Sequence, residues 1–200
     1  MADLTHFFDA ELGERPLMAI LRGLPPDRTV ELAERAWDAG FGAVEVPVQS
    51  AASLDALRAT VDAGRRRGRP VGAGTVLSPE HVTRAAAAGA AFTVSPGTDP
   101  AVAVASATAG LAHLPGVATA TDVQRAVGLG LRWLKAFPAS LLGPGWFGAM
   151  HGPFPQARFV ATGGMDAGNA AGYLAAGAAA VAVGSALEDL AAVDRLAALA

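Results

Sequence analysis

The sequence predicts one α/β domain, a (β/α)8 TIM barrel with a short extra helix at its N-terminus. Short apolar segments alternate with Ala-rich amphipathic segments, and eight such strand–helix units follow one another about every 20–25 residues, as in barrels of this class. Most strand segments are continuous apolar runs, which is expected where helices cover both faces of a parallel sheet. We therefore predict a single domain over residues 1–200.

The elements follow in order along the chain. The extra helix is expected over residues 3–12, where it would plug the N-terminal end of the barrel. Strands are expected at residues 16–21, 43–48, 71–75, 91–95, 112–114, 131–137, 158–162 and 178–183. Helices are expected over residues 27–39, 51–63, 79–88, 100–108 and 120–127, and a helical pattern also follows each of the last three strands.

Glycines follow most of these helices and supply the left-handed cap that leads into the next strand. They are Gly40, Gly64, Gly89, Gly110, Gly130 and Gly177. An open, doubly wound sheet is the alternative architecture. The count of eight units and the absence of a GxGxxG motif after the first strand favour the barrel.

Composition narrows the class of protein. Hydrophobic residues make up 52% of the chain, which supports a large core, and the net charge is −3. Basic residues are scattered apart from a cluster at residues 65–67, which we interpret as a solvated helix end, so no nucleic-acid partner is expected. There are no cysteines and the four histidines show no ligand spacing, so no metal site is expected. No signal peptide or membrane span is recognisable, which predicts a cytoplasmic protein without a membrane partner.

Lys135 is the only lysine of the chain, and it lies inside an apolar strand. Glu45 lies inside another strand, between two valines. Burying either charge alone is costly, so we expect the two to be paired. A salt bridge that only fixes the register is one interpretation, but hydrophobic residues usually serve that purpose as well. We favour a nucleophilic amine with a proton-shuttling carboxylate, because an apolar pocket disfavours the ammonium form.

Two glycine-rich turns predict a phosphate site. The Thr-Gly-Gly turn at residues 162–164 ends the seventh strand before a helix expected near Asp166, and the Gly-Ser turn at residues 184–185 ends the eighth strand before a helix expected over residues 186–190. Backbone N–H groups of such turns and of helix N-termini bind anions. The loops after strands 7 and 8 commonly hold phosphate in barrels, so a phosphorylated small molecule is the expected substrate.

Polar residues at the C-terminal ends of barrel strands point into the active-site mouth. The sequence places eight there: Arg22, Glu45, Gln49, Thr75, Ser95, Lys135, Thr162 and Ser185. The small residues around Thr75, at positions 72–76, leave room in the mouth, although by themselves we interpret them as packing of a crowded strand.

Together these residues resemble the 2-dehydro-3-deoxy-phosphogluconate and 4-hydroxy-2-oxoglutarate aldolase family, including its phosphogalactonate branch. The resemblance extends from about residue 16 to residue 185 and is specific, because several motifs follow in order at the right spacing. The motifs are MAILRG (18–23), AVEVPVQS (43–50), VGAGTVLSPE (71–80), FTVSPG (92–97), LPGVATATD (114–122), LKAFPAS (134–140), VATGG (160–164) and VAVGSAL (181–187).

The resemblance implies a class I aldolase, a carbon–carbon lyase that works as a homotrimer of barrels without a metal or another cofactor. By position, Lys135 matches the imine-forming lysine of the family's KxFPA motif, and Glu45 matches the acid/base glutamate of its VEV motif. The other implied site residues are Thr75 for the substrate carboxylate, Pro96 and Phe137 in the pocket lining, and Gly163, Gly164, Gly184 and Ser185 around the phosphate.

The chain mixes the signatures of two branches. Gln49 stands where the phosphogluconate branch usually carries an arginine, and Arg22, in an ILRG motif typical of the phosphogalactonate branch, is the expected substitute. Thr162 and the SPG segment at residues 95–97 are typical of the phosphogluconate branch instead. Arg22, Gln49 and Thr162 are therefore all candidate substrate-binding residues. Their mixed signatures do not decide which C4 epimer is the substrate.

The implied reaction cleaves 2-dehydro-3-deoxy-6-phosphogluconate into pyruvate and D-glyceraldehyde 3-phosphate, with 4-hydroxy-2-oxoglutarate as a further candidate substrate. The alternative is 2-dehydro-3-deoxy-6-phosphogalactonate, the C4 epimer, cleaved by the same chemistry. A more distant alternative is a phosphate-binding barrel isomerase, which shares the glycine turns but needs no lysine buried in a strand. A barrel that only binds a sugar phosphate would not exchange the methyl protons of pyruvate.

Overall fold

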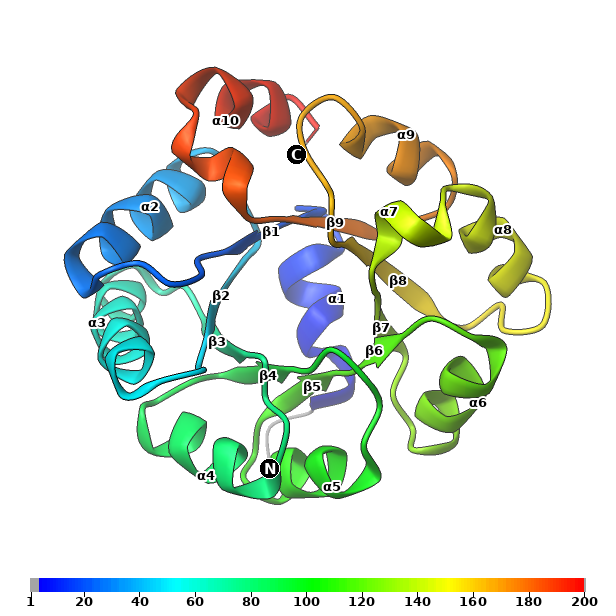
Figure 1. Ribbon diagram of the computed structural model, residues 1–200, viewed down its shortest axis with the longest axis horizontal. Helices are drawn as coiled ribbons and strands as arrows, with labels where there is room; N and C mark the ends of the chain where they lie inside the picture. The colour runs from blue at the N-terminus through cyan, green and yellow to red at the C-terminus, as the bar shows by residue number, and fades with distance from the viewer. Residues whose placement is uncertain (1–3, 200) are drawn as a thin grey trace.

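The chain folds as a nearly closed ring of parallel strands surrounded by helices, seen down the barrel in Figure 1. The computed structural model describes residues 4–199, without the side chains of Thr5, Ser185, Ala186 and Leu190. The strands are β1 (Leu17–Ile20), β2 (Ala43–Pro47), β3 (Val71–Gly74), β4 (Phe92–Val94), β5 (Ala112–Leu114), β6 (Gly116–Val117), β7 (Trp133–Ala136), β8 (Arg158–Thr162) and β9 (Ala180–Val183). Every strand predicted from the sequence is confirmed to within a few residues.

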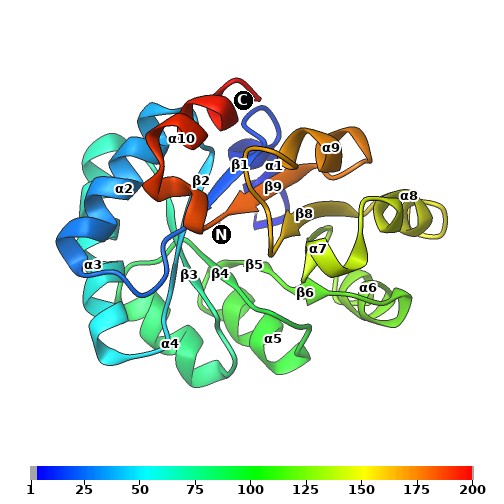
Figure 2. The same ribbon diagram turned by 45° about the horizontal axis from the view of Figure 1, so that its top comes forward.

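All helices except α1 cover the outside of the ring, as the tilted view in Figure 2 also shows. The helices are α1 (Phe7–Leu12), α2 (Pro26–Asp38), α3 (Ala51–Arg67), α4 (Pro79–Ala87), α5 (Pro100–Thr108), α6 (Ala120–Gly128), α7 (Ala139–Leu142), α8 (Gly145–His151), α9 (Ala170–Ala175) and α10 (Leu190–Ala197), with 3-10 turns η1 (Leu4–His6) and η2 (Ser185–Glu188). Among the helices in residues 4–199, none is both long and apolar enough to cross a membrane.

The ring is interrupted by a seam between β5 and β6. The sequence did not predict β6 as a separate strand. These two segments are the edges of the sheet, because β5 pairs with β4 and β6 pairs with β7. Pro115 lies between them and has no N–H to donate to a ladder, while its carbonyl accepts a hydrogen bond from the backbone of Lys135 at 2.8 Å. The two segments therefore fill one strand position, so that nine segments build the predicted eight-fold barrel.

Side chains of each strand alternate between two cores, since successive residues of a strand point to opposite faces. Met18 and Val160 pack inside the barrel, whereas their neighbours Leu17 and Phe159 pack between the barrel and the helices. Nearly all strand residues are buried as a result. This explains why the strands form continuous apolar runs, as predicted from the sequence.

The N-terminal helix α1 lies across one end of the barrel (Figure 1), as predicted. Its Phe8 and Leu12 are buried in the interior cluster, and the ring of Phe8 lies 5.4 Å from that of Phe92. The Nε1–H of Trp133 donates a hydrogen bond to Asp9 at 2.9 Å, which ties the helix to β7. The plug is thus held by both apolar packing and a polar anchor.

One predicted glycine cap is wrong. Helix α3 continues through Gly64 and ends at Gly68, which adopts the left-handed conformation with φ of 63°. Gly64 is buried within the helix, where a Cβ would clash with the carbonyl of Arg69, so its glycine is needed for close packing. The predicted positive φ is confirmed at the other five positions, Gly40, Gly89, Gly110, Gly130 and Gly177.

The last two helices begin later than predicted. Asp166 first forms a turn in which its carboxylate accepts from the backbone of Gly168 at 2.7 Å and of Asn169 at 3.1 Å, and α9 begins only at Ala170. The helix expected over residues 186–190 is instead the 3-10 turn η2, followed by α10. Both connections at the predicted phosphate end are therefore turns before they become helices.

Candidate active site

Lys135 and Glu45 meet inside the barrel. Both side chains are buried, with relative exposures of 5% for Lys135 and 0% for Glu45. Lys135 Nζ lies 3.9 Å from Glu45 Oε1, which is close enough for an ion pair but too far for a hydrogen bond. Neither carboxylate oxygen of Glu45 has a hydrogen-bond partner among the described residues. The predicted pairing of the two groups is confirmed, and each keeps hydrogen-bonding capacity for an incoming molecule.

The carboxylate of Glu45 occupies space that a side chain on β3 would fill. β2 and β3 are neighbours, with Pro47 in register with Gly74. A Cβ on Gly74 would collide with the carboxylate of Glu45. Part of the glycine-rich segment at residues 72–76 therefore does more than pack a crowded strand, because it makes room for the carboxylate.

Phe137 covers the amine of Lys135. Lys135 Nζ lies 5.2 Å from the centroid of the Phe137 ring, and this aromatic residue lines the same cavity. The peptide bond between Phe137 and Pro138 is cis. A Cβ on Gly163 would lie 3.2 Å from the Phe137 ring, so the glycine turn after β8 packs directly against this cover.

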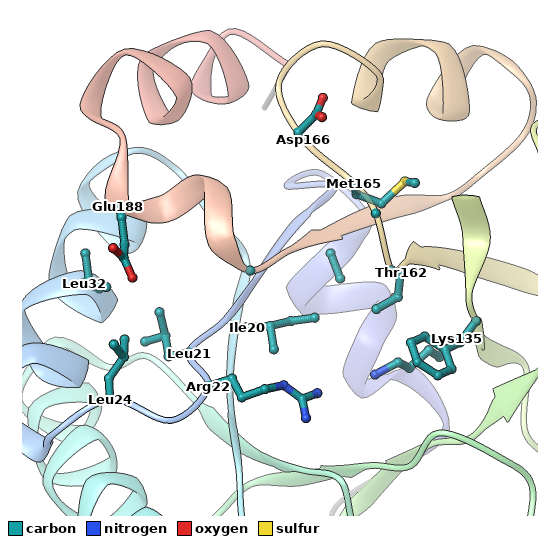
Figure 3. Close-up of a pocket in the computed structure, with 15 residues that line it drawn as sticks. Ile20, Leu21, Arg22, Leu24, Leu32, Lys135, Thr162, Met165, Asp166 and Glu188 are labelled. Carbon is teal, nitrogen blue, oxygen red and sulfur yellow. The ribbon is translucent and has the colours of Figure 1, made fainter. Parts of the chain in front are cut away.

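A cavity of about 500 Å³ opens over Lys135. Figure 3 shows the side chains that line it, with the amine of Lys135 and the guanidinium of Arg22 directed toward each other across the space. Among its described lining residues these are the only two basic side chains. The complete lining comprises Ile20, Leu21, Arg22, Leu24, Leu32, Lys135, Phe137, Thr162, Gly163, Gly164, Met165, Asp166, Ala182, Gly184 and Glu188.

The side chain of Gln49 contacts the guanidinium of Arg22. Nη1 of Arg22 donates a hydrogen bond to Oε1 of Gln49 at 2.9 Å. Arg22 and Gln49 are the two candidates for binding the substrate carboxylate, and the structure brings them into contact. Of the two, only Arg22 lines the cavity of about 500 Å³. Gln49 lines a separate cavity of about 90 Å³, together with residues such as His81 and Arg84.

The glycines of the predicted phosphate turns also line the cavity. Gly163 and Gly164 have positive φ values of 94° and 76°, which glycine adopts without strain. Asn169 holds the turn, because its Nδ2 donates to the carbonyl of Gly164 at 2.9 Å. Gly184 lines the same space from the end of β9, and Thr162 does so from β8. The side chain of Ser185 lies outside the described part of the structure.

Four predicted site residues do not line this cavity, namely Glu45, Gln49, Thr75 and Pro96. Thr75 follows β3 with a φ of 58°, an unusual conformation for a residue with a side chain, and Pro96 follows β4. Both lie at the C-terminal ends of their strands and are half-buried, on the side of the mouth that carries Glu45 rather than the glycine turns. They therefore keep the predicted location at the mouth, outside the cavity itself.

Sequence reasoning missed several lining residues. Ile20 and Met165 are apolar and give no chemical signal of their own. Asp166 and Glu188 add two carboxylates to the lining. The position of Asp166, two residues after the Thr-Gly-Gly turn, was the one available signal. No group of three or more metal-ligating side chains occurs in the part of the chain that the structure describes.

A parallel barrel whose mouth holds a buried lysine beside an unbonded carboxylate defines a class I aldolase type of site. A model of the KDPG and KHG aldolase family, named for 2-dehydro-3-deoxy-phosphogluconate and 4-hydroxy-2-oxoglutarate, matches residues 8–197. The chain therefore belongs to this family of carbon–carbon lyases, as the sequence resemblance implied.

Individual relatives agree with this assignment. A 2-dehydro-3-deoxy-6-phosphogalactonate aldolase of Escherichia coli K12 is 38% identical over 171 residues, which is 85% of this chain and 83% of the relative. The solved structure of a 4-hydroxy-2-oxoglutarate and phosphogluconate aldolase from TTHB1 is 35% identical, with a TM-score of 0.84 and coverage of 100% of this chain and 99% of that one.

A third relative bears on the chemistry. The solved structure of KDPG aldolase from Legionella pneumophila, with pyruvate captured as a covalent carbinolamine, is 27% identical to this chain. Its TM-score is 0.83, and the match covers 99% of this chain and 96% of that one. This family thus uses a covalent intermediate between protein and pyruvate.

Proposed function

We propose that this protein cleaves 2-dehydro-3-deoxy-6-phosphogluconate into pyruvate and D-glyceraldehyde 3-phosphate through an imine on Lys135. The observation that carries the proposal is the buried pair itself: Lys135 Nζ lies 3.9 Å from a Glu45 carboxylate that has no hydrogen-bond partner among the described residues. A pair that served only stability would be expected to satisfy its polar atoms internally.

The chemistry begins at the amine of Lys135, which attacks the C2 carbonyl carbon of the substrate. Glu45 delivers a proton to the carbinolamine oxygen, water leaves, and an iminium forms. Glu45, now the base, takes the proton from the C4 hydroxyl, the C3–C4 bond breaks, and its electron pair moves into the iminium to give an enamine. The aldehyde leaves, C3 is protonated, and water hydrolyses the imine to pyruvate.

Two sets of lining groups fit the two ends of this substrate. Arg22 offers a guanidinium across the cavity from Lys135, and the carboxylate next to C2 would lie between them, since guanidinium groups bind carboxylates through charge-assisted hydrogen bonds. The turns at Gly163, Gly164 and Gly184 offer backbone groups to the phosphate. Binding at both ends would orient C3 and C4 over the reactive pair. Thr75 and Pro96 would contact the substrate from the opposite side of the mouth.

The C4 epimer, 2-dehydro-3-deoxy-6-phosphogalactonate, is the second candidate substrate. The sequence favours the phosphogluconate form through Thr162, which lines the cavity. The Escherichia coli relative is named for the galactonate form, and Arg22 stands in the motif typical of that branch. The reaction at Lys135 is the same for both epimers.

Cleavage of both epimers, assayed side by side through pyruvate release, tests this proposal. We expect the gluconate form to be cleaved with the higher kcat/KM. A clear preference for the galactonate form would transfer the assignment to the second candidate. Absence of pyruvate release from either epimer, and from 4-hydroxy-2-oxoglutarate, would contradict the proposed function.

We further propose that the protein is a cytoplasmic homotrimer. Apolar side chains are exposed on the helical surface, among them Val104 of α5 at 61% and Leu141 of α7 at 83% relative exposure, and an interface would bury such residues. Light scattering during size-exclusion chromatography should give three times the chain mass of 20.0 kDa. A mass equal to one chain would refute the trimer without affecting the proposed chemistry.

A further inference from the structure

Gln49 contacts Arg22 but does not line the substrate cavity. Its side-chain oxygen accepts the hydrogen bond from Arg22 Nη1 at 2.9 Å. Arg22 lines the 500 Å³ cavity over Lys135, whereas Gln49 lines the neighbouring 90 Å³ cavity. The amide thus contacts the arginine and does not line the cavity over Lys135.

The strands explain why these two side chains meet. β1 and β2 are parallel neighbours, with Ile20 in register with Glu45. Arg22 follows Ile20 by two residues, and Gln49 follows Glu45 by four, so both lie just beyond the C-terminal ends of their strands, at the barrel mouth. β2 therefore supplies both the carboxylate that pairs with Lys135 and the amide that contacts Arg22.

The partner of Arg22 is neutral, and this matters for its chemistry. Within the described residues, no carboxylate lies within ion-pair distance of the Arg22 guanidinium. An amide oxygen fixes the direction of the guanidinium but leaves its positive charge uncompensated. A glutamate in the same place would fix the direction equally well and would neutralise the charge that a substrate carboxylate needs.

We propose that Gln49 is a positioning residue that holds the guanidinium of Arg22 toward Lys135, where it binds the carboxylate of the 2-keto acid. The proposal rests on the function given above, in which Lys135 forms an imine at C2. Gln49 then acts on substrate affinity through Arg22 and takes no part in proton transfer.

Exchange of the methyl protons of pyruvate for deuterium, followed by NMR, isolates this end of the site, because pyruvate has no phosphate. Arg22→Ala should raise the KM for pyruvate roughly tenfold or more, since a charge-assisted contact is lost. Gln49→Ala should raise it about 3- to 10-fold, with kcat for exchange within about twofold of the wild type. Gln49→Glu should raise KM at least as much as Gln49→Ala.

The double variant separates positioning from direct binding. If Gln49 acts through Arg22, Gln49→Ala should have no further effect on KM in the Arg22→Ala background. Gln156→Ala is the matched control, because this exposed glutamine lies between α8 and β8 at the opposite end of the barrel. Thermal melting of each variant checks that the fold is retained.

Each result has a definite meaning. Additive effects of the two alanine substitutions, an unchanged KM in Gln49→Ala beside a raised KM in Arg22→Ala, or a lowered KM in Gln49→Glu would overturn the positioning role. An unchanged KM in Arg22→Ala would overturn the carboxylate assignment of Arg22, and the role of Gln49 with it. Absence of methyl-proton exchange in the wild-type protein would instead contradict the proposed function itself.

Discussion

At the scale of single residues, the site depends on a carboxylate that the fold buries without bonding it. Glu45 has no exposed surface, and both of its oxygens lack hydrogen-bond partners among the described residues. Leaving such a group unsatisfied costs stability. The arrangement therefore fits a group whose partner is a substrate.

Replacing Glu45 with glutamine tests its role in proton transfer. Glu45→Gln keeps the size of the side chain but removes the titrating carboxylate, so turnover should fall roughly 10²-fold or more while the fold is retained. Steady-state cleavage rates and circular dichroism measure the two effects. A rate equal to that of the wild type would favour a purely structural pair with Lys135.

Substitution of Gly74 should lower turnover about as much as substitution of Glu45, although glycine has no side chain that could take part in the reaction. A Cβ at this position would displace the Glu45 carboxylate, and misplacing a catalytic group by about 1 Å costs roughly 10²-fold in rate. Gly74→Ala should therefore lower turnover with little loss of stability, because the flexible carboxylate can move.

Gly128→Ala is the matched control for this change, since no described atom outside its own helix backbone and chain neighbours lies within 4 Å of a Cβ built there. It should leave the rate unchanged. Equal rates for the two variants would show that Gly74 does not set the position of Glu45.

The sequence allowed the reactive residues to be predicted but not the whole cavity. Lys135 and Glu45 stood out because a charge inside an apolar strand is costly and needs an explanation. Met165 and Ile20 could not be predicted, since an apolar residue that faces a cavity looks like one that faces a core. Which side of the mouth Thr75 occupies depends on how the barrel closes, and local sequence does not determine that.

At the scale of elements, β4, β5 and α5 are joined by a buried polar network that the proposed mechanism does not use. His113 of β5, 6% exposed, has its Nδ1 2.8 Å from Thr93 Oγ1, which lies 2.8 Å from Ser106 Oγ on α5. Its Nε2 lies 3.4 Å from Ser95 Oγ. Burial lowers the pKa of His113 from 6.5 to about 4, so this histidine is neutral near pH 7.

This network predicts a pH-dependent stability. Above pH 6.5, His113 is neutral in both the folded and unfolded chains. As the pH falls from 6.5 toward 4, the unfolded chain binds a proton that the folded chain resists, so the free energy of unfolding decreases. At pH 4.5 this loss should reach roughly 2 kcal/mol relative to pH 7.

Urea unfolding of the wild type and of His113→Gln at the two pH values measures this contribution. The variant should be less stable at pH 7 but should lose less on acidification, since it lacks the titrating group. Identical losses in the two proteins would exclude His113 as the cause.

The boundaries of some helices were predicted less accurately than those of the strands. The strands were predicted closely because continuous apolar runs are a strong signal. The end of α3 was misplaced at Gly64 because a glycine needed for close packing looks the same in sequence as a glycine cap. The start of α9 was misplaced because the side chains of Asp166 and Asn169 first stabilise a turn, an outcome that helical periodicity does not report.

At the scale of the whole molecule, the barrel brings residues from distant parts of the chain to one reactive centre. Glu45 comes from β2 and Lys135 from β7, while Arg22 follows β1. The seam at Pro115 belongs to this arrangement, because the proline carbonyl binds the backbone N–H of Lys135 at 2.8 Å. The interruption of the strand thus lies directly beside the reactive lysine.

The most direct test is whether Lys135 forms the imine. Borohydride reduction in the presence of pyruvate, followed by mass spectrometry of the intact protein and its peptides, should show one pyruvate-derived adduct, located on the peptide that carries Lys135. The chain has no other lysine, so the N-terminal amine is the only rival. No adduct in the wild type, or an adduct that persists in Lys135→Met, would contradict the assignment of Lys135.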